Sequence, residues 1–488
     1  MENMDSFVNE ISEWLELIVG YVWGIPLVVI LVGSGLLLTV ILGGVQIKGF
    51  RHALSVVRGK YDNPDEPGEI TPFQALCTAL SATVGLGNIA GVAIAISVGG
   101  PGAVFWMVMT GLVGMATKFA ECTLSVKYRK VDSKGVVHGG PMYYIERGLG
   151  KKWKPLAVFF AFACIFSSFG AANMFQTNQV ASILNESFNL PPLMVGLVIA
   201  FLVAIVIIGG IKRIGQVTSV LVPFMGAIYV LGAVLVIGIN ISEVPALIGQ
   251  IINDAFSGTA AVGGFTGVAF RQVLVQGVRR ACFSNEAGLG SSPIAHSAAA
   301  THEPVREGVV ALLEPFIDTV VICSMTALVI LMSGAWTQDI GAMGGVELTA
   351  VAFNTAIPGF GTIFVPIAVT LFAYSTLLSW SYYGERAMDY LLGNSKHIDR
   401  GLLVYKTLFC VFAVVGAVWN IRPVLAFSDI MLGLMVVPNM IAVVLLIPVL
   451  RKEASSYFSR LSEGGFDQEA KDAEKARKRA ASKLALSS

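Results

Sequence analysis

The stretch SATVGLGNIAG, residues 81–91, determines how the rest of the chain is interpreted. It lies inside an apolar run at 73–98 that has the length of a membrane helix. Gly85, Gly87 and Asn88 interrupt this run near its middle, where a spanning helix would be expected to continue unbroken. The sequence therefore predicts a discontinuous helix at membrane depth.

The composition is that of a helical membrane protein. Apolar residues make up 55% of the 488 positions and charged residues 13%, and the mean hydropathy is +0.74. Soluble domains carry about 25% charged residues, and outer-membrane barrels show short alternating strands instead of long apolar runs. The first 22 residues are acidic and lack a basic n-region, so no cleavable signal peptide is expected.

Eleven apolar runs are long enough to span a bilayer. We expect spans at 23–45, 73–98, 103–124, 155–184, 193–210, 217–239, 277–299, 309–331, 362–385, 403–419 and 425–449. The segments 242–276 and 339–357 are too polar or too rich in glycine to span, and we expect external re-entrant or amphipathic elements there. The tail from residue 450 is expected to form a mixed-charge surface helix or a disordered end.

Lysine and arginine alternate between the connections, and this alternation predicts the orientation. Nearly all of them lie in the basic connections, which are residues 46–72, 125–154, 211–216, 300–308, 386–402 and the tail from residue 451. The exceptions on the opposite side are Arg271, Arg279, Arg280 and Arg422. The chain is therefore expected to cross the inner (plasma) membrane many times, with its N-terminus outside and its C-terminus in the cytoplasm.

A second interruption occurs in FSNEAGLGSSPIAHS, residues 283–297. Its core AGLGS at 287–291 is similar to VGLGN at 84–88, and the two lie five expected spans apart. An odd number of spans per repeat inverts the second copy, so 73–239 and 277–449 are expected to form an inverted repeat, with 23–45 as an additional helix. Paired interruptions of this kind indicate a transporter's binding site.

An unwound segment frees backbone groups that a helix would otherwise satisfy, and this is tolerated where they face protein, ions or a watery cavity. Freed carbonyls can bind Na⁺, and the N-terminus of the next half-helix can hold a carboxylate. Two such segments therefore suit a zwitterion with a cation. The alternative is that the glycines only allow helices to pack closely.

Oxygen ligands for a cation are available on the ninth expected span. Ser375 and Thr376 follow Phe372 by three and four positions, so the three share one helical face. Oxygen ligands suit alkali cations, although interhelical hydrogen bonding would also explain these hydroxyls. The cysteines are scattered singly in apolar runs and are expected to be structural, without metal or disulfide spacing: Cys77, Cys122, Cys164, Cys282, Cys323 and Cys410.

Charged residues inside spans are candidates for function. Glu286 lies in the second interruption and can pair with Arg279 or Arg280, titrate, or brace the unwound backbone, and we favour bracing. The spacing of the others favours structural pairs of Asp318 with Glu314 and of Lys118 with Glu121. Asp318 is the further candidate for an ion or proton role.

Several long motifs resemble the sodium:alanine (alanine or glycine:cation) symporter family, whose fold is of the LeuT type. The motifs are FQALCTALSATVGLGNIAGVA at 73–93, GGPMYYIERGLG at 139–150, ANMFQTNQVA at 172–181, FSNEAGLGSSPIAHSAA at 283–299 and FAYSTLLSWSYYGER at 372–386. The resemblance extends from about residue 23 to about residue 451. It implies an all-α membrane protein with a five-plus-five inverted repeat and one extra N-terminal helix.

The resemblance also implies roles for individual residues. The carboxylate of the substrate would meet the amides of Leu86 and Gly87 beside Asn88, with Gln176 as a further polar contact. Phe283 and Trp380 would close the side-chain end. One Na⁺ would bind carbonyls of Ser81, Val84 and Phe372 and hydroxyls of Ser375 and Thr376. A second would use the Thr83 carbonyl, Asn88 and Ser284.

The resemblance implies Na⁺-coupled symport of alanine or glycine by alternating access, with a small amino acid and the bilayer as partners and no nucleic acid. An enzyme is not expected, because the chain has no nucleotide loop, zinc-protease motif or nucleophile elbow. A proton-coupled carrier of the same fold and a non-transporting amino-acid sensor on this scaffold are the alternatives.

Overall fold

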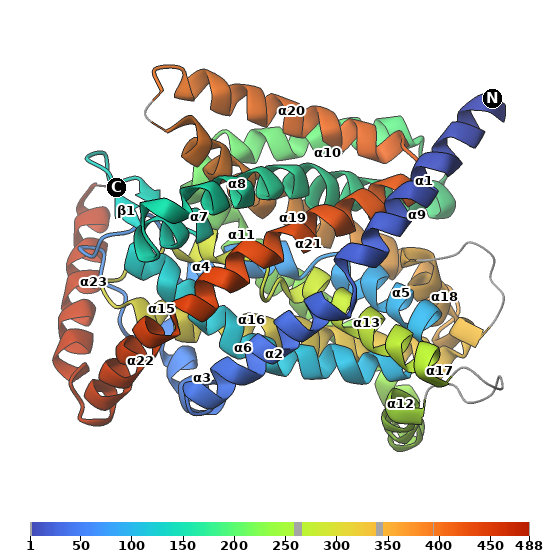
Figure 1. Ribbon diagram of the computed structural model, residues 1–488, viewed down its shortest axis with the longest axis horizontal. Helices are drawn as coiled ribbons and strands as arrows, with labels where there is room; N and C mark the ends of the chain where they lie inside the picture. The colour runs from blue at the N-terminus through green and yellow to red at the C-terminus, as the bar shows by residue number, and fades with distance from the viewer. Residues whose placement is uncertain (1, 258–265, 338–344, 394, 488) are drawn as a thin grey trace.

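The structure is a computed structural model that describes residues 2–257, 266–337, 345–393 and 395–487. Helices make up most of this part of the chain, and most of them run along the long axis of the molecule (Figure 1). The strands β1 (Lys130–Val131) and β2 (Val137–His138) form a short antiparallel ribbon in which Lys130 pairs with His138. The all-α class predicted from the sequence is confirmed.

The first half of the chain, up to residue 239, contains the first interruption. Its helices are α1 (Glu2–Val22), α2 (Ile25–Ile41), α3 (Val45–Val57), α4 (Pro72–Thr83), η1 (Gly87–Gly91), α5 (Val92–Gly99), α6 (Gly102–Tyr128), α7 (Pro141–Tyr143), η2 (Tyr144–Gly148), η3 (Lys151–Trp153), α8 (Lys154–Phe169), η4 (Gly170–Met174), α9 (Phe175–Phe188), α10 (Pro192–Ile207) and α11 (Gly210–Ile239).

The second half contains the second interruption and the tail. Its helices are η5 (Ile241–Glu243), α12 (Val244–Ser257), α13 (Thr266–Asn285), α14 (Ser292–His296), α15 (Pro304–Ala311), α16 (Leu313–Pro315), η6 (Phe316–Cys323), α17 (Ser324–Ser333), η7 (Ala335–Thr337), α18 (Val346–Ala356), α19 (Phe360–Leu392), α20 (Ile398–Val418), α21 (Ile421–Leu445), α22 (Ile447–Ser462) and α23 (Asp467–Ser487).

Many of these helices are long and apolar enough to cross a membrane. Among the described residues, 7 pass by length and composition, and up to 9 pass if each bent pair counts as one span. The pairs are Glu10–Val22 with Ile25–Ile41, bent by 41°, and Pro72–Thr83 with Gly87–Gly99, bent by 49°. Exposed Leu193, Leu197 and Phe201 on α10 form a surface suited to lipid. The chain is a multi-pass membrane protein.

Local sequence explains where the helices around the interruptions begin. Thr71 caps α4 by accepting from the Gln74 N–H at 3.2 Å, and the Gln74 side chain accepts from the Thr71 N–H at 3.0 Å. Pro72 at the first helical position completes this capping box.

On α6, a Cβ built at Gly114 would lie 2.9 Å from Cβ of Ala287 in the second interruption. Glycine here therefore allows α6 to pack closely against the unwound chain.

Three segments differ from, or add to, what the sequence predicted. The span expected at 277–299 begins as α13 at Thr266, since its polar start is helical and packs against α6. The segments expected to be external elements contain helices α12 and α18, and the remainder at 258–265 and 338–344 lies outside the described residues. The acidic start of the chain forms α1, which packs against α21.

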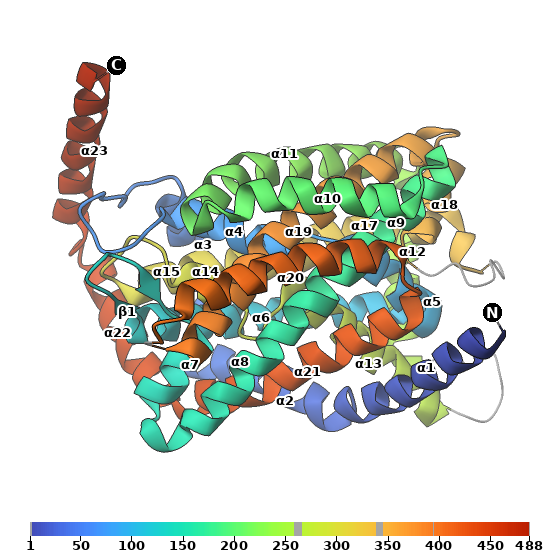
Figure 2. The ribbon, with the colours of Figure 1, turned by 90° about the horizontal axis from the view of Figure 1, so that it is seen from above.

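The basic connections gather at one end of the molecule, together with the tail. Figures 1 and 2 both place α3, α7, α15, α22 and α23 at the end that holds the C-terminus, and α5, α12 and α18 at the opposite end, near the N-terminus. The tail is helical over α22 and α23, in line with the expected surface helix. We call the end with the basic connections the basic end.

Paired side chains dock the tail onto the basic end. Arg306 makes two contacts with the Glu469 carboxylate, at 2.5 and 2.9 Å, and Arg460 makes two with Glu303, at 2.7 and 2.9 Å. His52 on α3 lies 2.6 Å from the hydroxyl of Tyr457 on α22. Burial lowers the pKa of His52 from 6.5 to about 4, with the Arg306 and Lys60 charges acting in the same direction.

Candidate functional site

The first interruption is an unwound turn followed by a wide helical turn. α4 ends at Thr83, and Val84, with φ −75° and ψ 83°, leaves the helix. The Asn88 Oδ1 accepts from the Gly85 N–H at 2.8 Å and so holds the turn in place. The chain then resumes as the π-helical turn η1 before continuing as α5. π-helical turns are frequent at functional sites.

Two backbone donors in this turn are free. Among the hydrogen bonds of the described residues, none uses the N–H of Leu86 or of Gly87. Both residues are buried, and Leu86 directly precedes the turn η1, whose first residue is Gly87. Unpaired buried N–H groups are rare in proteins, and at the start of a helix they suit an anionic ligand.

The second interruption contains three residues in left-handed conformations. α13 ends at Asn285, Glu286 has φ +58°, Gly288 has φ +90° and Gly290 has φ +81°. A left-handed glutamate is uncommon and is maintained only where its surroundings fix it. The Asn285 Oδ1 accepts from the Ala287 N–H at 2.9 Å. The chain then forms the short helix α14.

The two interruptions cross in direct contact. A Cβ built at Gly87 would lie 2.7 Å from the Cα of Ser284, a distance that real Cβ atoms do not show. A Cβ built at Gly85 would lie 2.4 Å from the Oγ1 of Thr376 on α19. Glycine at 85 and 87 is therefore required for close approach of α19 and α13 to the unwound turn.

A narrow cavity lies at this crossing and has room for about one water molecule. A larger ligand therefore requires side chains of the wall to move. Its lining combines residues from both interruptions with residues of η4, α9, α19 and α21: Ala82, Thr83, Gly85, Gly87, Ala171, Ala172, Gln176, Phe283, Glu286, Thr376, Trp380 and Leu432.

Gln176 supplies an unpartnered polar atom to the wall of this cavity. Its Nε2 donates to the Ala171 carbonyl at 3.2 Å, while its buried Oε1 has no partner among the described residues. A buried polar atom without a partner costs stability unless something else binds it. This oxygen can accept a hydrogen bond from a ligand in the cavity.

Phe283 and Trp380 form the aromatic part of the wall. Phe283 packs edge-on against Phe175, with ring centroids 5.4 Å apart. The Trp380 Nε1–H donates to the Glu286 Oε1 at 2.7 Å, which fixes the indole against the second interruption. Both residues line this cavity, and their predicted role in closing the side-chain end of a substrate pocket stays a prediction.

Glu286 braces the unwound backbone, as expected. Its carboxylate accepts from Trp380 and from the Ser291 hydroxyl, so it connects the second interruption to α19. It does not pair with Arg279 or Arg280, since both guanidinium groups contact Asp429 on α21. The carboxylate thus provides the hydrogen bonds that hold its own left-handed conformation.

Four oxygens meet where α4 passes α19. The Thr376 Oγ1 lies 3.1 Å from the carbonyl oxygens of both Ser81 and Phe372, and the Ser375 Oγ lies 3.2 and 2.8 Å from the same two oxygens. These are four of the five groups predicted for one Na⁺. The fifth, the Val84 carbonyl, has left the α4 ladder, and its role stays a prediction.

A buried carboxylate joins two residues that were predicted for a second ion. The Asp318 Oδ1 accepts from the Asn88 Nδ2 at 2.6 Å, and the Ser284 hydroxyl lies 2.9 and 3.0 Å from the two Asp318 oxygens. Thr319 also donates to Asp318, at 2.7 Å. Among the described residues no cationic side chain pairs with this fully buried carboxylate. The ligand set predicted for the second ion omits Asp318, although its charge within a span had made Asp318 a separate candidate for an ion or proton role.

Two pairs predicted from helical spacing are wrong. Glu314 contacts Lys118 and His296 instead of Asp318, and Glu121 accepts from the Asn439 amide instead of pairing with Lys118. In both cases a partner from another helix is better placed than the neighbour on the same helix. The wide turn η6 begins directly after α16, so the regular i, i+4 geometry does not extend from Glu314 to Asp318.

The predicted site residues fall into two groups. Thr83, Gly87, Gln176, Phe283 and Trp380 line the cavity together with Thr376, whereas Leu86 and Asn88 are buried beside it and are not part of the lining. For Leu86 the predicted group is the free backbone N–H. The Asn88 side chain faces Asp318 and Gly85. All thirteen predicted residues lie on α4, η1, α9, α13 or α19 or in the turn between α4 and η1.

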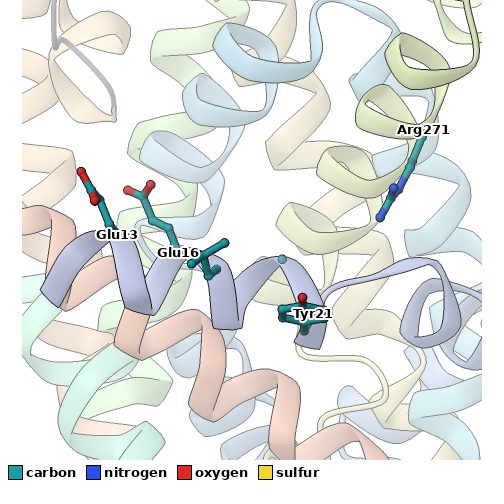
Figure 3. Close-up of a pocket in the computed structure, with 6 residues that line it drawn as sticks. Glu13, Glu16, Tyr21 and Arg271 are labelled. Carbon is teal, nitrogen blue, oxygen red and sulfur yellow. The ribbon is translucent and has the colours of Figure 1, made fainter. Parts of the chain in front are cut away.

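A wider cavity lies away from the interruptions, between α1 and α13, at the end opposite the basic end. Glu13, Glu16 and Tyr21 on α1 and Arg271 on α13 are part of its lining (Figure 3). It is open to the surface and contains no residue of either interruption. Size alone therefore does not indicate the site, and the free backbone groups favour the narrow cavity.

The chain is similar to known proteins over most of its length. The sequence profile of the sodium:alanine symporter family matches residues 8–472. The sodium/alanine symporter AgcS of Methanococcus maripaludis is 42% identical over 440 residues, which is 90% of this chain and 95% of AgcS. An uncharacterized transporter of Haemophilus influenzae is 42% identical over 461 residues, 94% of this chain and 99% of that protein.

A solved structure shares the fold. The crystal structure of MhsT in complex with L-phenylalanine matches with a TM-score of 0.52 at 13% identity, and the match covers 78% of this chain and 98% of MhsT. At this identity the likeness concerns the fold alone. The LeuT-type fold predicted from the sequence is confirmed.

Proposed function

The chain belongs to the sodium:alanine symporter family, and from this premise we propose that it couples Na⁺ entry to uptake of a small neutral amino acid, alanine or glycine. The observation that carries the proposal is the cavity where the two interruptions cross, with free donors on one side and oxygens of α4 and α19 on the other. Substrate and ion would enter by alternating access, in which the two repeats move around this site.

The free donors supply the carboxylate end of the substrate pocket. The N–H groups of Leu86 and Gly87 would hold the carboxylate, as at other helix N-termini, beside Asn88 and Thr83. The free Oε1 of Gln176 would accept from the substrate's ammonium group. Because Phe283 and Trp380 close the narrow cavity, a methyl or hydrogen side chain fits better than a long one.

The four oxygens of α4 and α19 would bind the first Na⁺. Carbonyls of Ser81 and Phe372 and hydroxyls of Ser375 and Thr376 are already within 3.2 Å of one another in the pairs described above, and the Val84 carbonyl would complete the set. Such a site joins the unwound helix to α19. Ion binding would therefore favour one arrangement of the two helices and so affect substrate binding.

The cluster around Asp318 would bind the second cation. Asn88 and Ser284 both contact this carboxylate, and the Thr83 carbonyl was predicted as a further ligand. A fully buried carboxylate without a cationic partner is costly unless a cation or a proton compensates it. Asp318 is therefore the residue that we add to the predicted ligands.

The proposed function implies an organisation around the inverted repeat. The repeats would comprise 73–239 and 277–449, with 1–22 outside, 23–45 as an additional helix and 450–488 in the cytoplasm. The separation of the basic end from the opposite end supports this orientation. Reporters fused to the C-terminus test the orientation. A reporter that is active only on the external side would show that the proposed orientation is reversed.

Uptake of radiolabelled alanine and glycine into proteoliposomes tests the function. We expect accumulation that requires an inward Na⁺ gradient and disappears when choline replaces Na⁺ at fixed pH. Accumulation that follows a pH gradient without Na⁺ would instead identify a proton-coupled carrier. Saturable binding of alanine without flux under either gradient would identify a sensor.

A further inference from the structure

A second group of buried charges lies between the cavity and the basic end. His296 is the last residue of α14; its Nδ1 lies 2.5 Å from the Glu307 Oε1 and its Nε2 lies 2.6 Å from the Glu314 Oε1. Lys118 on α6 lies 3.1 Å from the other oxygen of Glu314. All four side chains are completely buried. The proposed transport cycle does not use them.

The contacts of His296 set the number of protons in this group. A neutral imidazole has one N–H and one bare nitrogen. Because both nitrogens face carboxylate oxygens, a neutral imidazole between two carboxylates would place a lone pair directly against an oxygen. Both contacts are hydrogen bonds only when one further proton is present, either on the imidazole or on one carboxylate.

The charge balance leads to the same proton count. With Lys118 protonated and His296 neutral, the two carboxylates leave a net negative charge in a fully buried site. One additional proton makes these four side chains neutral together, and of the further charged groups near them Arg129 is basic whereas Glu121 and Glu286 are acidic. Cys122 also lies near His296 and Glu314, as a metal ligand would. The Lys118 ammonium and the occupied imidazole nitrogens oppose a metal cation there.

The proton would hold together parts of the chain that we expect to separate when the basic end opens. His296 ends the half-helix α14, whereas Glu307 lies in the first turn of α15 and Glu314 lies on α16. Arg129 ties down the chain just beyond α14 through the carbonyls of Ser297 and Ala299, both at 2.6 Å. If α14 moved away from α15, His296 would lose a carboxylate and the additional proton would no longer be needed.

We propose that His296, Glu307 and Glu314 form a proton-binding site, and that the bound proton holds α14 against α15 and α16 and slows opening at the basic end. The proton comes from water on that side and returns to it. By linkage, the packed arrangement binds the proton more tightly than the open one. Other titratable or charged groups that face the site are Asp62, Lys118, Glu121, Cys122, Arg129, Glu286 and Tyr383.

The test uses Glu307→Gln, which keeps the shape and gives the imidazole an amide N–H donor without an additional proton. Its matched control is Glu303→Gln, which loses a surface ion pair with Arg460 and leaves the buried group unchanged. Alanine uptake at saturating Na⁺ is measured in proteoliposomes while the pH facing the basic end is varied from about 6 to about 9. The pH on the other side is held constant.

We expect uptake by the wild type and by Glu303→Gln to rise with pH at the basic end, by up to about tenfold per unit for one proton. Uptake by Glu307→Gln should not depend on this pH. A profile of Glu307→Gln that coincides with the wild type would overturn the proposal. A wild-type rate that ignores this pH would do the same, even if the variant did not fold.

This inference rests on the proposed transport function, and a second readout separates the two. Hydrogen exchange of residues 292–300 is measured in detergent as a function of pH. We expect protection beyond the intrinsic pH effect to fall at high pH in the wild type and to be independent of pH in Glu307→Gln. Loss of uptake under every gradient, with this exchange pattern intact, would reject the transport function and leave the proton site standing. Equal exchange profiles would reject the proton site.

Discussion

Replacing Thr376 by valine tests the ion site directly, because valine keeps the branched shape and removes only the hydroxyl. The Thr376 Oγ1 lies 3.1 Å from the carbonyl oxygens of both Ser81 and Phe372, so it is one of four oxygens that would surround the cation. A hydrogen bond to a charged group contributes about 1.5–3 kcal/mol, and we take the contact of one hydroxyl with the cation to be of this size. We expect Na⁺ affinity to fall roughly ten- to a hundredfold.

The assay must separate the ion from the substrate, since Thr376 also lines the cavity. Alanine binding in detergent is titrated against Na⁺ for the wild type, for Thr376→Val and for the control Thr370→Val. Thr370 lies on the same helix, and its hydroxyl donates to the Pro366 carbonyl at 2.7 Å. We expect the Na⁺ midpoint to shift only in Thr376→Val, while alanine affinity at saturating Na⁺ changes far less. An unchanged Na⁺ midpoint with a collapse of alanine affinity would refute the ion assignment and place Thr376 in the substrate pocket.

Three further substitutions test other parts of the molecule. Trp380→Ala removes both the aromatic wall and the donor to Glu286. It should admit larger apolar amino acids in a competition assay and lower the free energy of unfolding by about 3–5 kcal/mol. Wild-type selectivity in this variant would show that Trp380 does not limit the pocket. Asp318→Asn should raise the Na⁺ concentration for half-maximal uptake by at least about tenfold, from the loss of a contact of about 1.5–3 kcal/mol; an unchanged Na⁺ dependence would remove Asp318 from the second ion site. His52 should stabilise the docking of α22 fully above pH 6.5 and progressively less as the pH falls toward about 4. The reason is that its pKa is lowered in the folded protein, so the unfolded chain binds the proton first. Hydrogen exchange of residues 447–462 should show this pH dependence and should lose it in His52→Gln.

Much of the fold follows from local signals in the sequence. The apolar runs predict where helices lie, and the glycines at 85, 87, 288 and 290 predict where they stop. The start of α13 at Thr266 could not be predicted in this way. Residues 266–285 have no net apolar character, and the packing of α13 against α6 compensates for it.

The partners of the buried charged side chains could not be predicted from the sequence. Helical spacing favoured Glu314 for Asp318, yet Asp318 contacts Asn88 and Ser284, which lie 230 and 34 positions away along the chain. Such pairs depend on which helices pack together in the fold, and the residue spacing within one helix carries no information about its neighbours. The oxygens around Thr376 could be predicted only through the resemblance to a family, since a hydroxyl on a helix is equally suited to packing.

The contact between Gly87 and Ser284 also limits how this protein can be redesigned. A methyl group at position 87 would lie 2.7 Å from the backbone of α13, so even alanine would push the two unwound segments apart. Libraries aimed at new substrates should therefore leave position 87 unchanged and diversify Gln176, Phe283 and Trp380, whose side chains line the cavity. Substrate range can therefore be changed by substitutions in the cavity wall, but not by substitutions where the two interruptions contact each other.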